Sequence, residues 1–420
     1  MTNPSAPAVP PCSADRIRDD VETLATFTEP SHPGWTRRAY SKEYTSAREW
    51  LASRMADCGL RVRRDAANNL IGTCAGRAGG RALATGSHTD TVEGGGRFDG
   101  IAGVLTALEA VRTLHESGIT LHHELRVVDF FNEEANAYGL SCVGSRALAG
   151  ALSQRDLALT DATGESLAQG LARAGGDPAS VADCAWTDDE LAAFVELHIE
   201  QGPVLEQQGY PLAVVTAIAG IDRHLLEFTG QPDHAGATPM DMRRDALCAA
   251  AEAVLAVEEL AGADGSVGTS GRLEVEPGAA NVVPGTARVW AEFRAADRER
   301  LDAAASGLGT AAREAAAKRG VEVQVHPLSS VSPVAADPGV QDVLASAADR
   351  HGMATRRLFS GAGHDSAHMA LLCPIGMLFV PSHGGRSHCP EEWTDPEDLA
   401  AGARALAQAL VDLDRSADRA

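Results

Sequence analysis

The stretch that decides the fold is LATGSHTDTVEGGGRFDGIAGVLTALEAVRTLHESGITLHHELRVVDFF, residues 83–131. It begins with a short apolar run, 83–88, which predicts a buried strand and its exit turn. After a glycine-rich loop, residues 99–118 place apolar side chains at helical spacing, and residues 125–131 form a second strand-like run. This strand–helix–strand alternation predicts an α/β fold with a largely parallel central sheet.

The middle of the chain has a different pattern. Between about residues 218 and 330, strand-like segments separated by turns flank two strong helical patterns, 246–261 and 299–320. One of these segments, 285–295, alternates apolar and polar residues as a half-buried strand does. We therefore expect residues 218–330 to form a compact α+β domain of their own.

The α/β pattern resumes in the last part of the chain, with a strand at 375–382 and a helix from residue 396 onwards. A length of 420 residues is long for a single core. We therefore predict a split α/β domain, residues 13–217 and 331–420, into which the α+β domain is inserted. Residues 1–12 are predicted to form a disordered tail.

Composition narrows the class of protein. A formal net charge of −22 argues against a nucleic-acid partner, because such partners bind basic surfaces. The eight cysteines are scattered without a CxxC motif, which favours reduced thiols and a cytoplasmic location. The N-terminal residues lack the basic and apolar regions of a signal peptide. No run approaches the ~18 apolar residues of a membrane span, so no membrane association is expected.

Histidines and carboxylates gather where the predicted strands end. In open α/β sheets, sites form outside the carboxyl ends of the strands, so these segments should deliver their side chains to one edge of the sheet. The candidate residues are His88, Asp99, Glu133, Glu134, His198 and His388.

These residue types favour a metal site. Histidine and carboxylate without cysteine suit Zn²⁺, Mn²⁺, Co²⁺ or Ni²⁺, and one carboxylate can bridge two such ions. Each residue alone has a plainer explanation, since Glu133 and Glu134 could be a solvated strand end and GGGRFDG, residues 94–100, a flexible loop. That loop is not a phosphate loop, because no Gly-Lys-Ser/Thr follows it. The co-occurrence of all these residues beside strand ends favours the metal site.

Between residues 83 and 395 the chain resembles the M20 metallopeptidase clan. It is most similar to the amidohydrolase branch, which holds N-carbamoyl-L-amino-acid hydrolases, β-ureidopropionases and allantoate amidohydrolases. His198 supports this branch, because the peptidase and aminoacylase branch usually has a carboxylate there. The matching motifs are, in family order, GSHTDTVEGGGRFDGIAGV, NEEANAYGLSCVGSRALAG, ELHIEQGPVLE, DHAGATPMDMRRDA, NVVPG, SGAGHD and GGRSHCPEE.

The resemblance implies a catalytic domain that binds two divalent metal ions per subunit, and an inserted lid domain that also forms a homodimer. By this resemblance, His88, Asp99 and His198 would hold one ion. Asp99 would bridge to the second ion, which Glu134 and His388 complete. Zinc is the expected metal, with manganese, cobalt or nickel as alternatives.

The resemblance also implies roles in the chemistry. Glu133 matches the general base, and Asp90 matches the carboxylate that orients the His88 imidazole, as a metal-bound histidine requires. His234 matches a histidine that reaches a neighbouring subunit's site and stabilises the tetrahedral oxyanion. Alone, His234 could equally be a capping or packing residue.

Four further positions match substrate contacts. Asn281 and Arg294 correspond to residues that hold the substrate carboxylate, a task that suits a planar guanidinium. Gln201 and His364 correspond to other substrate contacts. Without the resemblance, Arg294 could be a surface residue of a strand, Asn281 could shape a turn, and His364 could satisfy buried backbone groups.

The expected function is hydrolysis of a linear C–N amide or ureide bond in a small carboxylate-bearing substrate, most simply an N-carbamoyl-L-amino acid. Allantoate, N-carbamoyl-β-alanine, N-acyl amino acids and dipeptides are alternative substrates, and a catalytically silent metal-binding protein is the alternative outside enzymes. Departures from the family at 366–368, His383 and 221–228 make the substrate the least determined part of this prediction.

Overall fold

The computed structural model describes residues 8–262 and 265–417. The described residues fold into two compact units. The first unit contains the residues up to Thr216, together with Ala336–Leu358 and those from His364 onwards. The second unit contains Ala217–Ala335 and Phe359–Gly363. Within the described ranges, no helix is long and apolar enough to cross a membrane.

A mixed sheet has the strand order β1-β2-β4-β3-β5-β15-β6-β13, with β14 also paired to β6. Its strands form the centre of the first unit, except that β13 and the ends of β6 and β14 fall within the residue ranges of the second unit. Strands β4, β3, β5 and β15 run parallel, whereas β1 and β2, β2 and β4, and β15 and β6 pair antiparallel. This sheet confirms the predicted α/β class. The strands are β1 (Arg61–Arg64), β2 (Leu70–Cys74), β3 (Ala82–His88), β4 (Leu125–Phe130), β5 (Leu191–Ile199), β6 (Leu212–Ile218), β13 (Val334–Ala335), β14 (Thr355–Ser360) and β15 (Ile375–Val380).

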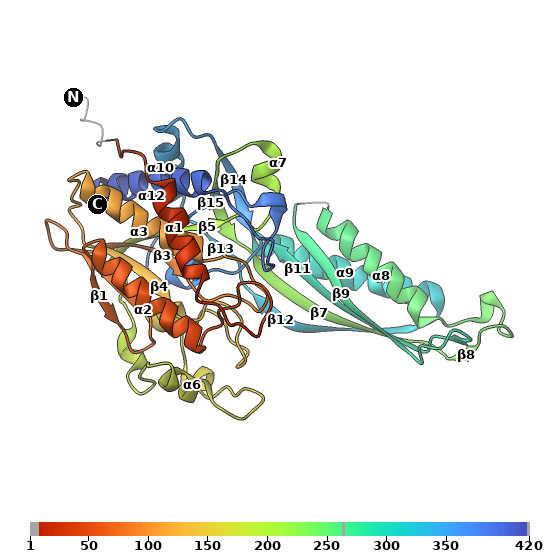
Figure 1. Cartoon of the computed structure of the whole chain (residues 1–420). Helices are drawn as coiled ribbons and strands as arrows, with labels where there is room; N and C mark the ends of the chain where they lie inside the picture. Colours follow the sequence, from red (N-terminus) through yellow and green to blue (C-terminus); the bar gives the residue numbers. More distant parts are fainter. Residues whose placement is uncertain (1–7, 263–264, 418–420) are drawn as a thin grey trace. The chain divides into compact units, whose positions relative to one another are not determined.

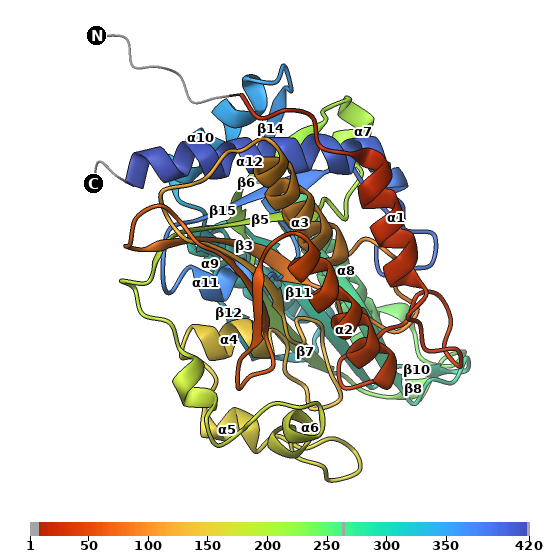
Figure 2. The same cartoon turned by 60° about the vertical axis from the view of Figure 1, so that its left-hand side comes forward.

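Helices cover both faces of this sheet, as Figure 2 shows. Side chains of β5 alternate between the faces: Leu197 packs into the core shared with the long helices, whereas Glu196 contacts Ser366 at the start of α11. Because both faces are buried, the parallel strands are almost continuous apolar runs. The long helices are α1 (Ala14–Ala25), α2 (Lys42–Asp57), α3 (Ile101–Glu116), α10 (Pro338–Asp349) and α12 (Pro396–Ala417), and the short ones are α4 (Val143–Leu148), α5 (Gln154–Leu157), α6 (Leu167–Arg173), α7 (Val204–Gln208) and α11 (Ser366–Met369).

The N-terminal segment differs in part from the predicted disordered tail. Residues 1–7 lie outside the described residues, but residues 8–12 contact the body of the first unit. The Val9 side chain is buried, its N–H donates to Gln408 Oε1 at 2.9 Å, and its carbonyl accepts from Arg404 Nε at 3.0 Å. A distant helix, α12, therefore orders these residues, and no local pattern could show this.

The second unit is an antiparallel sheet covered on one face by two helices (Figure 1). Its strand order is β12-β7-β11-β9, and buried and half-buried residues alternate along β11 as the sequence pattern predicts. Alanine dominates the helix faces that pack on this sheet, which allows helix and sheet to lie close together. The elements are β7 (Gly220–Thr229), β8 (Asp233–His234), α8 (Ala246–Gly262), β9 (Val267–Glu276), β10 (Val282–Val283), β11 (Thr286–Ala295), α9 (Arg298–Arg319) and β12 (Glu322–Val331).

A buried ion pair joins helix α2 to strand β4 of the central sheet. Arg48 Nε lies 2.6 Å from Asp129 Oδ2, and the two side chains are 2% and 0% exposed. The second oxygen of Asp129 accepts a hydrogen bond from Thr89 Oγ1 at 2.8 Å. Because both charges are removed from water, each depends on the other for compensation.

We predict that Arg48→Met lowers the free energy of unfolding by about 3–5 kcal/mol, because it leaves the Asp129 carboxylate buried and unpaired. Urea unfolding followed by circular dichroism measures this change. The control is Arg18→Met, which removes an exposed arginine paired with Asp15 and Asp19 and should leave the unfolding midpoint unchanged. Equal effects of the two substitutions would contradict the argument.

Candidate functional site

The ends of four parallel strands carry the predicted metal ligands. Strand β3 ends at His88, and β5 ends directly after His198. Residues 132–134 follow β4, and the segment with His388 follows β15. The sheet thus collects at one edge side chains that are far apart in the sequence, as expected for an open parallel sheet.

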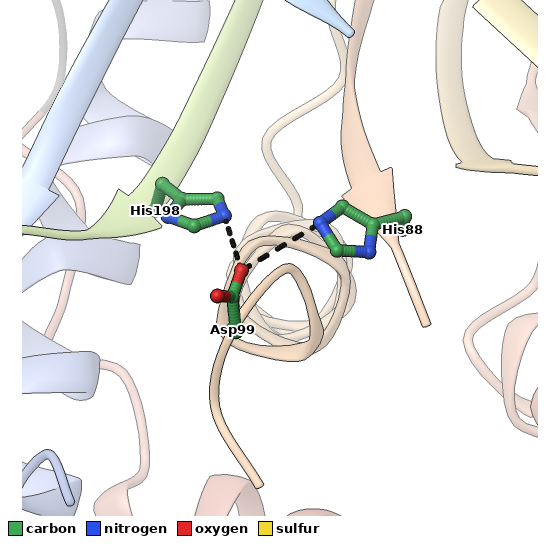
Figure 3. Close-up of side chains that lie close together, drawn as sticks. All are labelled: His88, Asp99 and His198. Carbon is green, nitrogen blue, oxygen red and sulfur yellow. Dashed lines mark ion pairs between the residues drawn. The ribbon is translucent and has the colours of Figure 1, made fainter. Parts of the chain in front are cut away.

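Asp99 lies between the two buried histidines (Figure 3). Its Oδ1 atom is 3.2 Å from His198 Nε2 and 3.7 Å from His88 Nε2. All three side chains are nearly inaccessible to solvent. Candidate ligand atoms of these residues lie within 4.8 Å of one another, a spacing that one ion can span.

The hydrogen bonds of the two imidazoles favour a cation at this position. His88 Nδ1 lies 3.1 Å from the carbonyl oxygen of Asp90, and His198 Nδ1 lies 2.9 Å from that of Ile199. Since a carbonyl only accepts, each Nδ1 carries the proton of a neutral ring, and each Nε2 keeps a lone pair on the side of Asp99. The His198 Nε2 also accepts a hydrogen bond from the backbone N–H of Gly100 at 3.1 Å. Lone pairs that face a carboxylate need a proton or a metal ion between them, so this donor set fits a divalent metal.

The second oxygen of Asp99 faces a second group of ligands. His388 Nε2 lies 3.0 Å from Asp99 Oδ2 and 3.4 Å from Glu134 Oε1. These three residues form another cluster that could hold an ion, and the His388 side chain is half exposed. Asp99 therefore divides its two oxygens between two clusters, as a bridging carboxylate does.

Charges in the two clusters shift one another's pKa. Burial alone would raise the pKa of Asp99, but His198 and His388 hold it well below its usual value. Burial would likewise lower the pKa of His88, yet Glu133 and Asp90 raise it well above its usual value. The hydrogen bond to Asp99 raises the pKa of His388 to about 9. His388 hence binds a proton at neutral pH unless a cation displaces it.

Glu133 is placed differently from its neighbour Glu134. Its Oε2 atom lies 3.6 Å from His88 Nε2, and its Oε1 atom accepts a hydrogen bond from the Cys142 thiol at 3.4 Å. Burial raises the pKa of Glu133 well above its usual value; His88 opposes this rise and Glu134 adds to it. A carboxylate with a raised pKa is suited to accept a proton near neutral pH.

The backbone at residues 132–134 explains how adjacent glutamates take separate positions. Asn132 has a φ of 55°, in the left-handed region, so the chain turns sharply after β4. The Asp90 carboxylate accepts hydrogen bonds from the backbone N–H of Glu133 at 3.2 Å and of Glu134 at 3.1 Å. Asp90 also lies beside His88, but its carbonyl is closer to that imidazole than its carboxylate, at 3.1 Å against 3.6 Å.

Two predicted substrate contacts also lie beside Asp99 and His198. Gln201 Nε2 donates to Asp99 Oδ2 at 2.7 Å, while its buried Oε1 has no hydrogen-bond partner among the described residues. The His364 ring packs edge-on against His198 with 4.6 Å between the ring centres. Burial lowers the pKa of His364 well below its usual value, and His198 lowers it further, so the ring stays neutral.

The other three predicted residues belong to the second unit. His234, on β8, is exposed, and its Nδ1 accepts hydrogen bonds from the N–H groups of Gly236 and Ala237 at 3.1 and 3.2 Å. Asn281 is exposed just before β10, which pairs with β8.

Arg294, on β11, is held within the second unit. Its Nε lies 2.6 Å from Glu292 Oε1, and its Nη1 donates to the Gly361 carbonyl at 2.7 Å. The remaining guanidinium nitrogen, Nη2, is the one that these two contacts leave for a substrate.

Sequence reasoning missed several buried polar residues around the clusters. Glu196 accepts hydrogen bonds from the hydroxyls of Ser87 at 2.7 Å and Ser366 at 2.6 Å. Its signal was a carboxylate in an otherwise apolar strand, two residues before His198. Glu392 holds the backbone next to Asp99, and only its position in the last motif could have indicated it.

The departures from the family pattern have different structural outcomes. Ser366 is buried and donates a hydrogen bond to Glu196 within a polar network. This departure from the family pattern therefore lies in the interior of the first unit. His383 is exposed, with Nε2 3.6 Å from Glu206 Oε1. His224, within 221–228, is buried on β7 of the second unit.

Comparison with known proteins places this geometry in a family. Residues 84–412 match Peptidase family M20/M25/M40. An N-carbamoyl-L-amino-acid amidohydrolase from Paenarthrobacter aurescens is 39% identical, covering 96% of this chain and 98% of its own. A ureidoglycolate hydrolase from Oryza sativa subsp. japonica is 38% identical, covering 95% of this chain and 84% of its own. A solved amidase of the hydantoinase/carbamoylase family from Burkholderia multivorans has a TM-score of 0.89 at 33% identity, covering 96% of this chain and 98% of its own.

The raised pKa values of the histidines predict how metal affinity depends on pH. Because a metal ion must displace protons from His88, His198 and His388, affinity should rise with pH. We expect an increase of about tenfold per pH unit for each proton displaced between about pH 6 and pH 9, with the contribution of His388 levelling off near its pKa of about 9. Competition with a chelator at several pH values measures this. Affinity that does not change over this range would contradict imidazole ligation.

Proposed function

The chain belongs to Peptidase family M20/M25/M40, and we propose that it is a metal-dependent hydrolase that cleaves the linear C–N bond of an N-carbamoyl-L-amino acid. One observation carries this proposal: the two oxygens of Asp99 face two histidine–carboxylate clusters, and the buried Glu133 carboxylate lies next to them. The sequence relatives are amidohydrolases and ureide hydrolases over nearly the whole chain, which favours a ureide substrate.

We propose two divalent ions per subunit, with zinc as the first candidate and manganese, cobalt or nickel as alternatives. His88, His198 and Asp99 would hold one ion, and Asp99, Glu134 and His388 the other. When bound, the ions would supply Lewis acidity towards the substrate carbonyl and towards water.

Glu133 would move the proton. Its carboxylate takes a proton from the attacking water as the water oxygen bonds to the carbamoyl carbon, and then delivers that proton to the amino-acid nitrogen as the C–N bond breaks. The products are the free amino acid and carbamic acid, which decomposes to CO2 and ammonia. The raised pKa of Glu133, caused first by burial, suits both halves of this transfer.

Residues around the clusters would orient the substrate. The unpartnered Oε1 of Gln201 can accept an N–H of the ureide, which has several such donors. His364 is the further substrate contact that the family resemblance implies. The second unit would contribute His234 to the oxyanion, and Arg294 with Asn281 to the substrate carboxylate.

Alternative substrates remain within the same chemistry. Allantoate, N-carbamoyl-β-alanine, N-acyl amino acids and dipeptides all present a carbonyl next to a C–N bond. The ureidoglycolate hydrolase activity of one relative adds a further ureide to this set. The homodimer, formed by the second unit as a lid, and the cytoplasmic location also stay predictions.

We predict that Glu133→Ala lowers kcat by about 10²–10⁴-fold and keeps both metal ions, because it removes the base and no ligand. Glu134→Ala should instead lose one equivalent of metal. Steady-state kinetics and metal analysis of the purified variants measure the two effects. The control is Glu93→Ala, which removes an exposed carboxylate from the loop before Asp99 and should change neither quantity. Near-normal turnover of Glu133→Ala would show that the base is assigned wrongly.

The substrate is tested with a panel assayed side by side. It contains N-carbamoyl, N-formyl and N-acetyl amino acids, N-carbamoyl-β-alanine, allantoate, ureidoglycolate and dipeptides, with enzyme reconstituted separately with Zn²⁺, Mn²⁺, Co²⁺ and Ni²⁺. We expect the highest kcat/KM on an N-carbamoyl-L-amino acid. A clear preference for a dipeptide would refute the ureide assignment, and bound metal without turnover on any substrate would favour a non-catalytic protein.

A further inference from the structure

Residues 381–395, which follow β15, pack against residues 89–100, the loop that carries Asp99. We call the first stretch the His388 segment and the second the Asp99 loop. The Trp393 ring packs edge-on against Phe98 with 5.3 Å between ring centres. The Trp393 carbonyl in turn accepts from the backbone N–H of His383 at 2.8 Å, which closes the segment on itself. The loop and the segment thus pack as one body next to the second metal cluster.

Glu392 is the polar centre of this contact. The residue is 1% exposed, and its Oε1 accepts hydrogen bonds from the backbone N–H of Phe98 at 2.8 Å and of Asp99 at 3.0 Å. A Cβ atom at Gly96 would lie only 2.2 Å from the same oxygen, so the loop approaches Glu392 as closely as glycine allows. Glu392 therefore fixes the backbone of Asp99 itself.

The other oxygen of Glu392 connects to the side chain of Asp99 through a serine. Ser387 Oγ lies 2.9 Å from Glu392 Oε2 and 2.9 Å from Asp99 Oδ2. A hydroxyl has one proton, so it donates to one of these carboxylates at a time. Ser387 precedes His388, whose Nε2 lies 3.0 Å from the same Asp99 oxygen. Glu392 is thus connected to both Asp99 and His388.

We propose that Glu392 is a positioning residue of the metal centre, which sets the separation between Asp99 and His388 and so the affinity of the second metal site. The inference rests on the proposed function for the identity of the ligands. It goes beyond that function because Glu392 is not one of the proposed metal ligands. Glu392 instead acts on the ligands through the Asp99 backbone and through Ser387.

Glu392 could also have a purely structural role at the start of helix α3. The N–H groups of Phe98 and Asp99 lie just before helix α3, so Glu392 could serve only to cap the start of that helix. A cap contributes to folding stability alone. A positioning residue also changes how tightly metal binds to the folded protein, and excess metal compensates for its loss.

The test compares Glu392→Ala, Glu392→Gln and Glu391→Ala with the wild-type chain. Glu391 is the matched control, because it is the adjacent carboxylate and makes only an exposed ion pair with Arg386. Isothermal titration with Zn²⁺ gives the affinity of each site, and kcat is measured as a function of Zn²⁺ concentration. Thermal unfolding of the metal-free proteins reports the stability that a cap would supply.

We expect Glu392→Ala to weaken the affinity of one of the two metal sites, the second site, by about 10–100-fold, and saturating Zn²⁺ to restore kcat. Glu392→Gln should stay closer to wild type, because its amide oxygen can still accept both backbone hydrogen bonds. Glu391→Ala should match wild type. Wild-type metal affinity in Glu392→Ala, with or without lower stability, would overturn the inference and leave only the cap.

The outcomes also separate this inference from the proposed function. A wild-type chain that binds Zn²⁺ but hydrolyses nothing in the substrate panel refutes the function, while the affinities still decide the role of Glu392. A wild-type chain that hydrolyses its substrate, together with unchanged affinity in Glu392→Ala, refutes only the inference. A wild-type chain that binds no divalent ion would refute both.

Discussion

The position of one carboxylate, Asp99, determines the arrangement of the candidate site. A buried carboxylate is stable only when its charge is compensated, and here histidines face both of its oxygens. The His88 and His198 imidazoles are themselves oriented by backbone carbonyls, which keep their Nε2 atoms towards Asp99. Holding the side chains of the two clusters this close together costs folding free energy when no cation is bound. A bound cation would make the same arrangement favourable. The surrounding fold can be understood as the structure that holds this arrangement in place.

The parallel sheet supplies most of that structure. Its strand ends fix His88 and His198 on adjacent strands, while the left-handed turn at Asn132 redirects the chain after β4. The Asp90 carboxylate then accepts hydrogen bonds from the backbone N–H groups of Glu133 and Glu134. These backbone hydrogen bonds to the buried Asp90 carboxylate fix the positions of both glutamates. The two glutamates can therefore take the separate positions that we propose for the base and for the metal ligand.

The sequence predicted those features that have a local signal. Strand and helix periodicity indicated the α/β class, and the candidate ligand residues stand out because polar side chains interrupt apolar strand ends. Glu392 and the buried residues 8–12 had no such signal, because their partners are distant in the chain: Glu392 binds the N–H of Phe98, 294 residues away. The exact hydrogen bonds of Asp90 were also beyond prediction, since they depend on the turn at Asn132.

The same reasoning explains why the reaction class is easier to infer than the substrate. The proposed ligands, the proposed base and the supporting carboxylates lie in the first unit, and all of them except Glu134 and His388 are buried. A change in one of the buried residues would therefore disturb its neighbours. The substrate contacts expected from the second unit are exposed or half-buried, and Arg294 is held by Glu292 and a single backbone carbonyl. Such residues can change without loss of the metal clusters. Two relatives of similar identity, an N-carbamoyl-L-amino-acid amidohydrolase and a ureidoglycolate hydrolase, differ in activity, which fits this division between buried clusters and more exposed recognition residues.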